Sequence, residues 1–297
     1  MLKLFNKFLW VTLCLFILFF NACTPTFVAD KLEEQAKLAI FKETGINAEI
    51  VLKEGTLFIY VTMPGITSLF TASSDVFNNI QRVVMMATRV ALSTDAEINF
   101  YHVTIAGEDN GAQIIFQQYI EDVRRYFYGY ISRSDFFKRS LLEDKLVKPG
   151  LGFNPDKLIP ITMPQFILSQ TVYRFKLKQH EEIVELFKTK QLKKAGEEES
   201  LEALTEQMTI KDAWVRYIGN NFIDKKYLPT TNSGFYFAYV FKELSLENLV
   251  DFEYNDFYES FVSTHEEVCN IYKFKDYKVV YIDIGSKIVF EKYIIKA

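Results

Sequence analysis

The sequence predicts an α+β fold: an N-terminal αββαββ arrangement, with helices covering an antiparallel sheet, followed by a mainly helical half that ends in a C-terminal β-hairpin. Two observations lead to this class. In residues 30–119 the spacing of apolar side chains alternates between the helical period of 3.6 and the strand period of 2. Near the C-terminus, two β-branched runs flank Gly285-Ser286, which is typical of a two-residue hairpin turn.

The first αββ segment occupies residues 32–62. Apolar side chains recur at helical spacing over 32–42, and Gly45 predicts the C-terminal end of that helix. Two β-rich runs follow, 48–53 and 56–62. The dipeptide Glu54-Gly55 between them predicts a hairpin.

The αββ order is then repeated. Residues 76–91 have the most regular helical spacing in the chain, and a second hairpin is expected from 97–106 and 112–119, turning through 107–111. Such a layered domain has one sheet face covered by helices and the other available for another contact. The element order is similar to that of the BON domain, a small periplasmic α/β module.

Beyond residue 120 the periodicity predicts mostly helices, with Ser134 as one N-cap. The expected helices are 121–130, 135–146, 165–190, 201–207, 210–222 and one that begins after 245. Residues 278–284 and 287–295 form the expected C-terminal hairpin.

A Pro- and Gly-rich segment at 147–164 is the best candidate for a boundary, because it holds four of the seven prolines. It divides an α+β domain at 30–146 from a mainly helical region at 165–297. Strands at the far C-terminus could instead complete the first sheet and make the chain one domain. The sequence leaves both arrangements open.

The first 22 residues have the order of a signal peptide. Lys3 and Lys7 precede an uncharged apolar run of 13 residues, 8–20, and a small-residue site follows. A bilayer-spanning helix needs about 20 apolar residues, so this run is short for a membrane span. We therefore expect cleavage after residue 22.

The residues Phe20-Asn21-Ala22-Cys23 resemble the lipobox of bacterial lipoproteins. This resemblance implies that the Cys23 sulfur carries a diacylglycerol, and that 23–29 is a lipidated tether from the lipid bilayer. In such lipoproteins, an Asp at the position of Thr24 would imply retention in the inner membrane. The Thr present here therefore implies the outer membrane, facing the periplasm. The alternatives are an ordinary secretory signal or an uncleaved anchor, with Cys23 incidental.

Composition narrows the classes of partner. Without Lys3 and Lys7 the chain has 32 basic and 38 acidic residues, a net charge of about −6. No dense basic patch is interleaved with aromatic residues, so nucleic acid is not an expected partner. Cys14 would be removed with the signal peptide, which leaves Cys269 without a second thiol for an intramolecular disulfide.

No motif assigns a catalytic residue, a metal site or a cofactor. His180 opens a zincin-like run, but Val184 occupies the position of the second histidine. His265 and Cys269 are four residues apart on an expected helix, and packing is the favoured interpretation of this pair. The alternative is a periplasmic ligand-binding protein or hydrolase with a site near these two residues.

Two aromatic clusters, at 126–130 and 235–239, stand out in a chain with 28 Phe and 17 Tyr. They either fill a core or form an interaction surface for a lipid, a glycan or a protein. The candidate surface residues are Tyr126, Tyr128, Tyr130, Tyr236 and Tyr239. We therefore expect an envelope lipoprotein with a non-catalytic structural, assembly or protein-interaction role, whose partner is another envelope protein.

Overall fold

The chain divides into two compact units, residues 1–160 and 161–297. The structure is a computed structural model. It describes residues 26–66, 73–108, 110–148, 152–189, 210–218, 234–241, 254–274, 277–283 and 289–294. The expected helix at 201–207 lies outside these ranges, as do Cys23 and the signal segment. Within the described part, no helix is long and apolar enough to cross a membrane.

Unit 1 contains the predicted αββαββ order and then adds a fifth strand. Its elements are η1 (Ala29–Lys31), α2 (Leu32–Thr44), β1 (Ala48–Lys53), β2 (Thr56–Met63), α3 (Ser74–Leu92), β3 (Phe100–Gly107), β4 (Ala112–Tyr119), α4 (Ile120–Phe127), α5 (Arg133–Lys138), β5 (Leu141–Leu146) and η2 (Pro155–Lys157).

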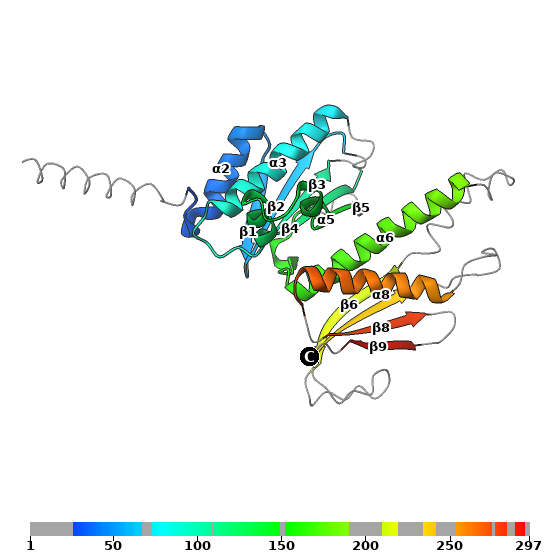
Figure 1. Ribbon diagram of the computed structural model, residues 1–297. Coiled ribbons are helices and arrows are strands. Elements are labelled where there is room, and N and C mark those ends of the chain that lie inside the picture. Colours follow the sequence, from blue (N-terminus) through cyan, green and yellow to red (C-terminus); the bar gives the residue numbers. More distant parts are fainter. Residues whose placement is uncertain are drawn as a thin grey trace, which may run out of the picture. The chain divides into compact units, whose positions relative to one another are not determined.

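The five strands form one sheet in the order β1-β2-β3-β4-β5. Strands β2 and β3 are parallel because α3 crosses over between them, and the other neighbouring pairs are antiparallel. Helices α2 and α3 lie on the same side of this sheet (Figure 1). The core between these helices and the sheet includes the enclosed side chains of Ala36, Ile40, Leu57, Val83, Ala87, Val90, Val103 and Ile105.

Local sequence explains where several of these elements begin and end. Gly45 ends α2 in the left-handed conformation, with φ of 73°. Glu54 and Gly55 both have positive φ, 46° and 73°, as a type I′ hairpin turn requires. The Ser73 hydroxyl accepts from the Val76 backbone N–H and caps the start of α3.

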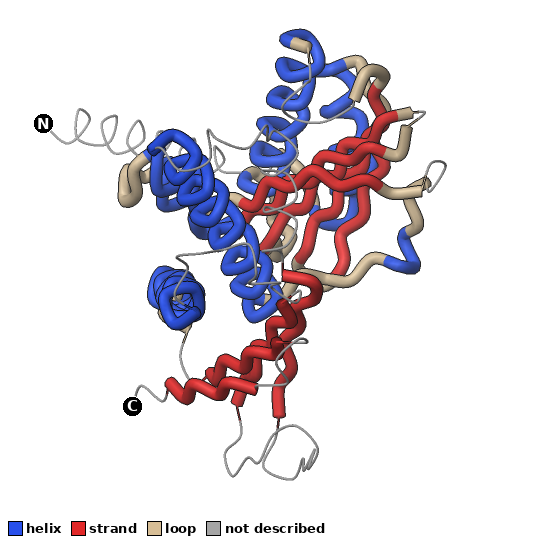
Figure 2. The backbone as a smooth tube through the Cα atoms, turned by 90° about the vertical axis from the view of Figure 1, so that its right-hand side faces the viewer, coloured by secondary structure: helices blue, strands red, loops and turns tan. Residues whose placement is uncertain are grey.

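Within the described residues, unit 2 has the same order of elements as the first αββαββ segment. Its elements are α6 (Met163–Thr189), β6 (Ile210–Ile218), β7 (Gly234–Phe241), α8 (Tyr254–Ile271), β8 (Tyr277–Asp283) and β9 (Val289–Ile294). The strand order is β6-β7-β8-β9, with a parallel central pair between two antiparallel pairs. Figure 2 shows the strands of the two units as separate red sheets.

The fold class is α+β, as predicted, but the helix predicted at 210–222 is wrong. Residues 210–218 form strand β6, paired with β7, in place of the expected helix. The apolar residues there recur at three- and four-residue spacings, which imitates a helix. Trp, Val, Tyr and Ile also favour strands, and pairing with β7 decides between the two. The C-terminal hairpin is confirmed, and it belongs to the sheet of unit 2.

The expected helix at 135–146 is also wrong. Helix α5 is short and begins after Ser132, whose hydroxyl accepts from the Asp135 backbone N–H, so the cap lies two residues before Ser134. Residues 141–146 form β5 and pair with 112–117 of β4. This pairing satisfies backbone groups of β4 that would otherwise form an open sheet edge.

Candidate functional site

An exposed group of aromatic rings on α4, α5 and their connection is the most distinctive surface of unit 1. We call it the aromatic patch, and its members are Tyr126, Phe127, Tyr128, Tyr130, Phe136 and Phe137. Four of these side chains are strongly exposed: Phe127 by 66%, Tyr128 by 74%, Tyr130 by 78% and Phe137 by 56%. Large apolar side chains grouped at this exposure are typical of a surface that binds something.

The rings of the aromatic patch form two contacting groups. Tyr126 stacks on Phe136 with ring centroids 4.7 Å apart, and it also lies 5.9 Å from Phe127. Phe136 and Phe137 meet edge to face at 5.7 Å, whereas Tyr128 and Tyr130 form a pair at 6.2 Å. The Tyr126–Phe136 stack therefore joins α4 to α5 and makes one surface from two helices.

The backbone between the helices turns sharply. Gly129 has φ of 75°, a conformation that suits glycine. The Tyr128 N–H donates to the Arg124 carbonyl at 2.9 Å, and the Tyr130 N–H donates to the Arg125 carbonyl at 2.8 Å. These bonds hold the exposed tyrosines close to the last turn of α4.

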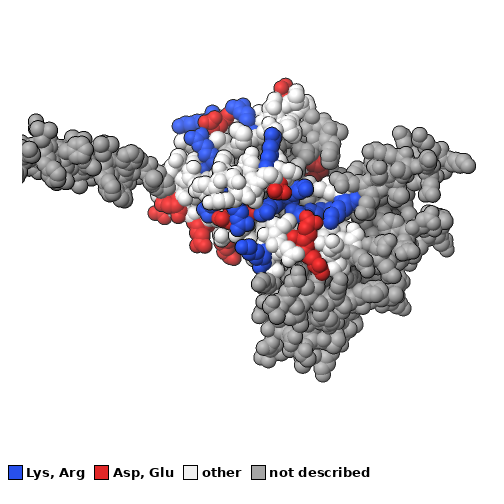
Figure 3. Space-filling view, viewed as in Figure 1, with Lys and Arg blue, Asp and Glu red and all other residues white. Residues whose placement is uncertain are grey.

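Basic side chains lie on the same two helices as the aromatic patch. The Arg133 guanidinium lies over the Phe137 ring, 5.6 Å from its centroid, which is a cation–π contact. Arg124 and Lys138 are exposed, and Arg124 lies 3.6 Å from the Glu121 carboxylate. Figure 3 shows basic and acidic side chains interspersed over the face of unit 1 in that view.

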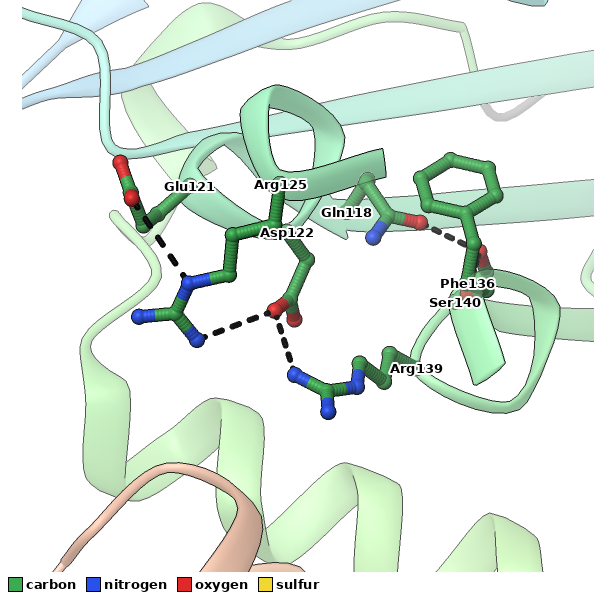
Figure 4. Close-up of polar contacts among 7 residues, drawn as sticks. All are labelled: Gln118, Glu121, Asp122, Arg125, Phe136, Arg139 and Ser140. Carbon is green, nitrogen blue, oxygen red and sulfur yellow. Dashed lines mark hydrogen bonds and ion pairs between the residues drawn. The ribbon is translucent and has the colours of Figure 1, made fainter. Parts of the chain in front are cut away.

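A buried ion pair links the two helical segments that carry the patch. Asp122 of α4 is fully buried, and its Oδ1 accepts from Arg139 Nη1 at 2.9 Å and lies 3.7 Å from Arg125 Nη1. Figure 4 shows Arg125 and Arg139 converging on this carboxylate from the two helical segments. Breaking a buried pair leaves a buried charge, so the arrangement resists separation of α4 from the end of α5.

A second polar contact joins the same segments to the sheet. The Ser140 hydroxyl bonds to the buried Gln118 side-chain carbonyl of β4 and lies 3.1 Å from the Phe136 carbonyl. Buried hydrogen-bonded groups fix geometry because leaving them unsatisfied is costly. The aromatic patch is therefore displayed on segments that buried polar contacts join to one another and to the sheet.

The structure brings together three of the five predicted surface residues. Tyr126, Tyr128 and Tyr130 belong to the aromatic patch. Tyr236 and Tyr239 lie in β7 of unit 2, paired between β6 and β8, and their side chains lie outside the described part.

Sequence reasoning missed Phe136 and Phe137 as members of the patch. Phe136 and Phe137 are adjacent on a short helix, where neighbouring side chains point in different directions. That adjacency was the available signal, because two consecutive Phe residues cannot both face the same core.

The pair formed by His265 and Cys269 is fully buried on α8. Cys269 Sγ lies 3.4 Å from His265 Nε2, and His265 Nδ1 lies 3.3 Å from Thr171 Oγ1 of α6. The Thr171 hydroxyl donates to the Ile167 carbonyl at 2.9 Å. This pattern assigns the imidazole proton to Nδ1 and leaves Nε2 to accept from the thiol.

This environment favours an uncharged pair. Burial lowers the pKa of His265 to about 3, so the imidazole is neutral at physiological pH. The Phe237 ring of β7 packs edge to face on it, with centroids 4.7 Å apart. A nucleophilic thiol needs an accessible thiolate, whereas both partners here are enclosed and contribute to packing.

The other histidines do not form a site within the described structure. His102 is half-buried on β3, where Gln117 Nε2 donates to its Nδ1 at 3.0 Å and its Nε2 lies 2.8 Å from Thr104 Oγ1. The side chain of His180 lies outside the described part. Among the described residues, no group of three His, Cys, Asp or Glu side chains could hold a metal ion.

Comparison with known proteins found no match to a family model, to a curated protein or to a solved structure.

Proposed function

We propose that the protein is a lipid-anchored envelope lipoprotein that acts by contact with another envelope component and has no catalytic role. The observation that carries this proposal is the aromatic patch, a set of exposed rings suited to binding rather than to bond chemistry. The enclosure of His265 and Cys269 gives further support, since these residues were the strongest candidates for chemistry.

The anchor in this proposal is an acylated Cys23, produced by removal of residues 1–22. Two or three acyl chains give stable membrane attachment, because each buried methylene contributes about 0.8 kcal/mol. Thr24 supports placement in the outer membrane, facing the periplasm. The role is structural, in assembly, or in binding another envelope protein.

The intact mass of protein extracted from membranes tests the anchor. We expect the loss of 22 residues and the gain of acyl mass, and a Cys23→Ser variant should lack the acyl mass. An unmodified N-terminus on the wild-type protein would refute the lipoprotein proposal.

Complementation in the native host tests the role. A Phe127→Ser/Tyr128→Ser variant should fail to complement a deletion, whereas the exposed control Met85→Ser on α3 should complement it. The double variant His265→Ala/Cys269→Ser should also complement when it folds stably. Loss of function in a stably folded form of that double variant would favour the ligand-binding or hydrolase alternative.

Capture of the acylated protein from membrane extracts tests for a protein partner. We expect a second envelope protein to be recovered reproducibly with the wild-type chain. Repeated recovery of the protein alone would argue against the protein-interaction role.

A further inference from the structure

The N-terminal end of the described chain is fixed to unit 1 from Phe27 onward. The Phe27 ring is 5% exposed, its N–H donates to the Ser93 carbonyl at 3.1 Å, and it forms a parallel bridge with Thr94. The Val28 N–H donates to Gln35 Oε1 at 2.9 Å, and the Ala29 N–H donates to Asp95 Oδ1 at 2.6 Å. Residues 27–29, which the sequence suggested as tether, are thus part of the folded unit.

The tether that remains is short. Only Thr24, Pro25 and Thr26 separate Cys23 from Phe27. Four Cα–Cα steps of an extended chain span at most about 14 Å, so an acylated Cys23 holds this end of unit 1 close to the bilayer. We call it the anchor end.

The aromatic patch is built at the anchor end. The Ile120 N–H at the start of α4 donates at 2.9 Å to the carbonyl of Asn99. Asn99 lies five residues after Thr94, which forms the bridge with Phe27. Helix α4 adds about 12 Å at 1.5 Å per residue, so the patch stays near the tethered end.

The position at which β5 begins also places the aromatic patch at the anchor end. Strand β5 begins at Leu141, which pairs with Gln117 near the end of β4. The segment 120–140 therefore leaves the sheet and rejoins it at the anchor end. By contrast, Leu146 pairs with Ala112 at the opposite end of β4, and its side chain is 81% exposed.

The chemistry of the patch suits the interface of a bilayer. Phe and Tyr rings partition to the level of the lipid headgroups, where Tyr keeps its hydroxyl in water. Arg124 of α4 and Arg133 and Lys138 of α5 are exposed, as is Asp135, and exposed basic side chains of this kind can pair with lipid phosphates.

We infer that the aromatic patch contacts the headgroup region of the bilayer to which Cys23 is anchored, as a second membrane contact. This inference rests on the proposed function and names the envelope component that the patch meets. A stable membrane contact built from two weaker elements is common among lipidated proteins.

Fluorescence quenching on the acylated full-length protein in liposomes tests the inference. A Tyr128→Cys variant carries a bimane label, and the liposomes contain a phospholipid with a quencher at the headgroup level. The matched control is Leu146→Cys, which is similarly exposed at the opposite end. Cys269 is buried, and protein without an added Cys gives the background. We expect severalfold stronger quenching at 128 than at 146, and equal quenching at both would overturn the inference.

A lengthened tether distinguishes binding of the patch to the bilayer from closeness that the short tether alone would cause. Fifteen Gly and Ser residues inserted after Thr24 should leave the quenching at 128 largely intact, because the patch itself binds the surface. Adding Phe127→Ser and Phe137→Ser to this variant should abolish the quenching at 128. Adding the control substitutions Phe77→Ser and Met85→Ser on α3 should leave that quenching unchanged. Loss of quenching on lengthening alone would overturn the inference.

Intact mass distinguishes this failure from failure of the anchor. Protein that carries acyl mass but shows no quenching at 128 refutes the bilayer contact and leaves the proposed function standing. Protein without acyl mass refutes the proposed function itself. A photo-cross-linker at Tyr128 that reacts with an envelope protein in native membranes, and not with lipid, would also overturn the inference.

Discussion

Replacing Arg139 by Met should destabilise unit 1, because it leaves the carboxylate of Asp122 buried with a weaker partner. Asp122 is fully buried, and Arg139 Nη1 is its partner at 2.9 Å. Removing one member of a buried pair costs about 3–5 kcal/mol. Arg125 remains 3.7 Å from the same oxygen, so we expect a reduced cost of about 2 kcal/mol in the free energy of unfolding.

A double-mutant cycle shows whether this cost comes from the uncompensated charge. In Asp122→Asn/Arg139→Met no buried carboxylate remains, so the double variant should be more stable than the sum of the single effects implies, by about 1–2 kcal/mol. Urea unfolding followed by far-UV circular dichroism gives each value.

The matched control is Arg89→Met. Arg89 lies 4.0 Å from Glu43 in an exposed pair, and its removal should change stability by less than about 0.5 kcal/mol. Equal effects of Arg139→Met and Arg89→Met, or strict additivity in the cycle, would refute the role assigned to the buried pair.

Three further predictions concern stability. Burial lowers the pKa of His265 to about 3, and burial with the nearby charge of Lys145 lowers that of His102 to about 4. Because the unfolded chain takes up these protons below pH 6.5, stability should fall between pH 6 and 4 by about 1.4 kcal/mol per pH unit for each histidine. Denaturant titrations at several pH values should show that the free energy of unfolding changes less per pH unit in His265→Gln than in the wild type. An unchanged pH dependence would contradict the low pKa assigned to His265. Cys269→Ala should cost about 1–2 kcal/mol in urea unfolding without loss of complementation, whereas a null phenotype in folded protein would contradict a packing role. Gly55→Ala should cost about 1–2 kcal/mol, because φ is positive and its Cβ would lie 2.8 Å from Asn99 Nδ2. A thermal melt with unchanged midpoint would contradict that strain.

Part of the fold could be predicted because it depends on local signals. The left-handed Gly45 ends α2, and the turn at Glu54-Gly55 sets the register of β1 and β2. The regular spacing of residues 76–91 predicts α3, which is present as Ser74–Leu92. In each case the residues that decide the structure are close together in the sequence, so periodicity and turn chemistry are sufficient.

Other parts depended on partners distant in the sequence. Residues 210–218 and 141–146 have spacings that permit helix or strand, and pairing with β7 and β4 makes them strands. The aromatic patch is a similar case. The composition of residues 126–130 suggested either a core or a surface, and only the packing of α4 against α5 exposes those rings.

By itself, the sequence determined the α+β class, the αββαββ order of the first unit and the candidate aromatic residues, because period and turn residues act locally. The tertiary structure alone decided that the described part of unit 2 has the same element order, that His265 and Cys269 are enclosed, and that the aromatic patch lies at the end of unit 1 where Phe27 is fixed. Burial and proximity are properties of chain segments that meet in space, and hydrophobic spacing along one segment does not specify which other segment will cover it.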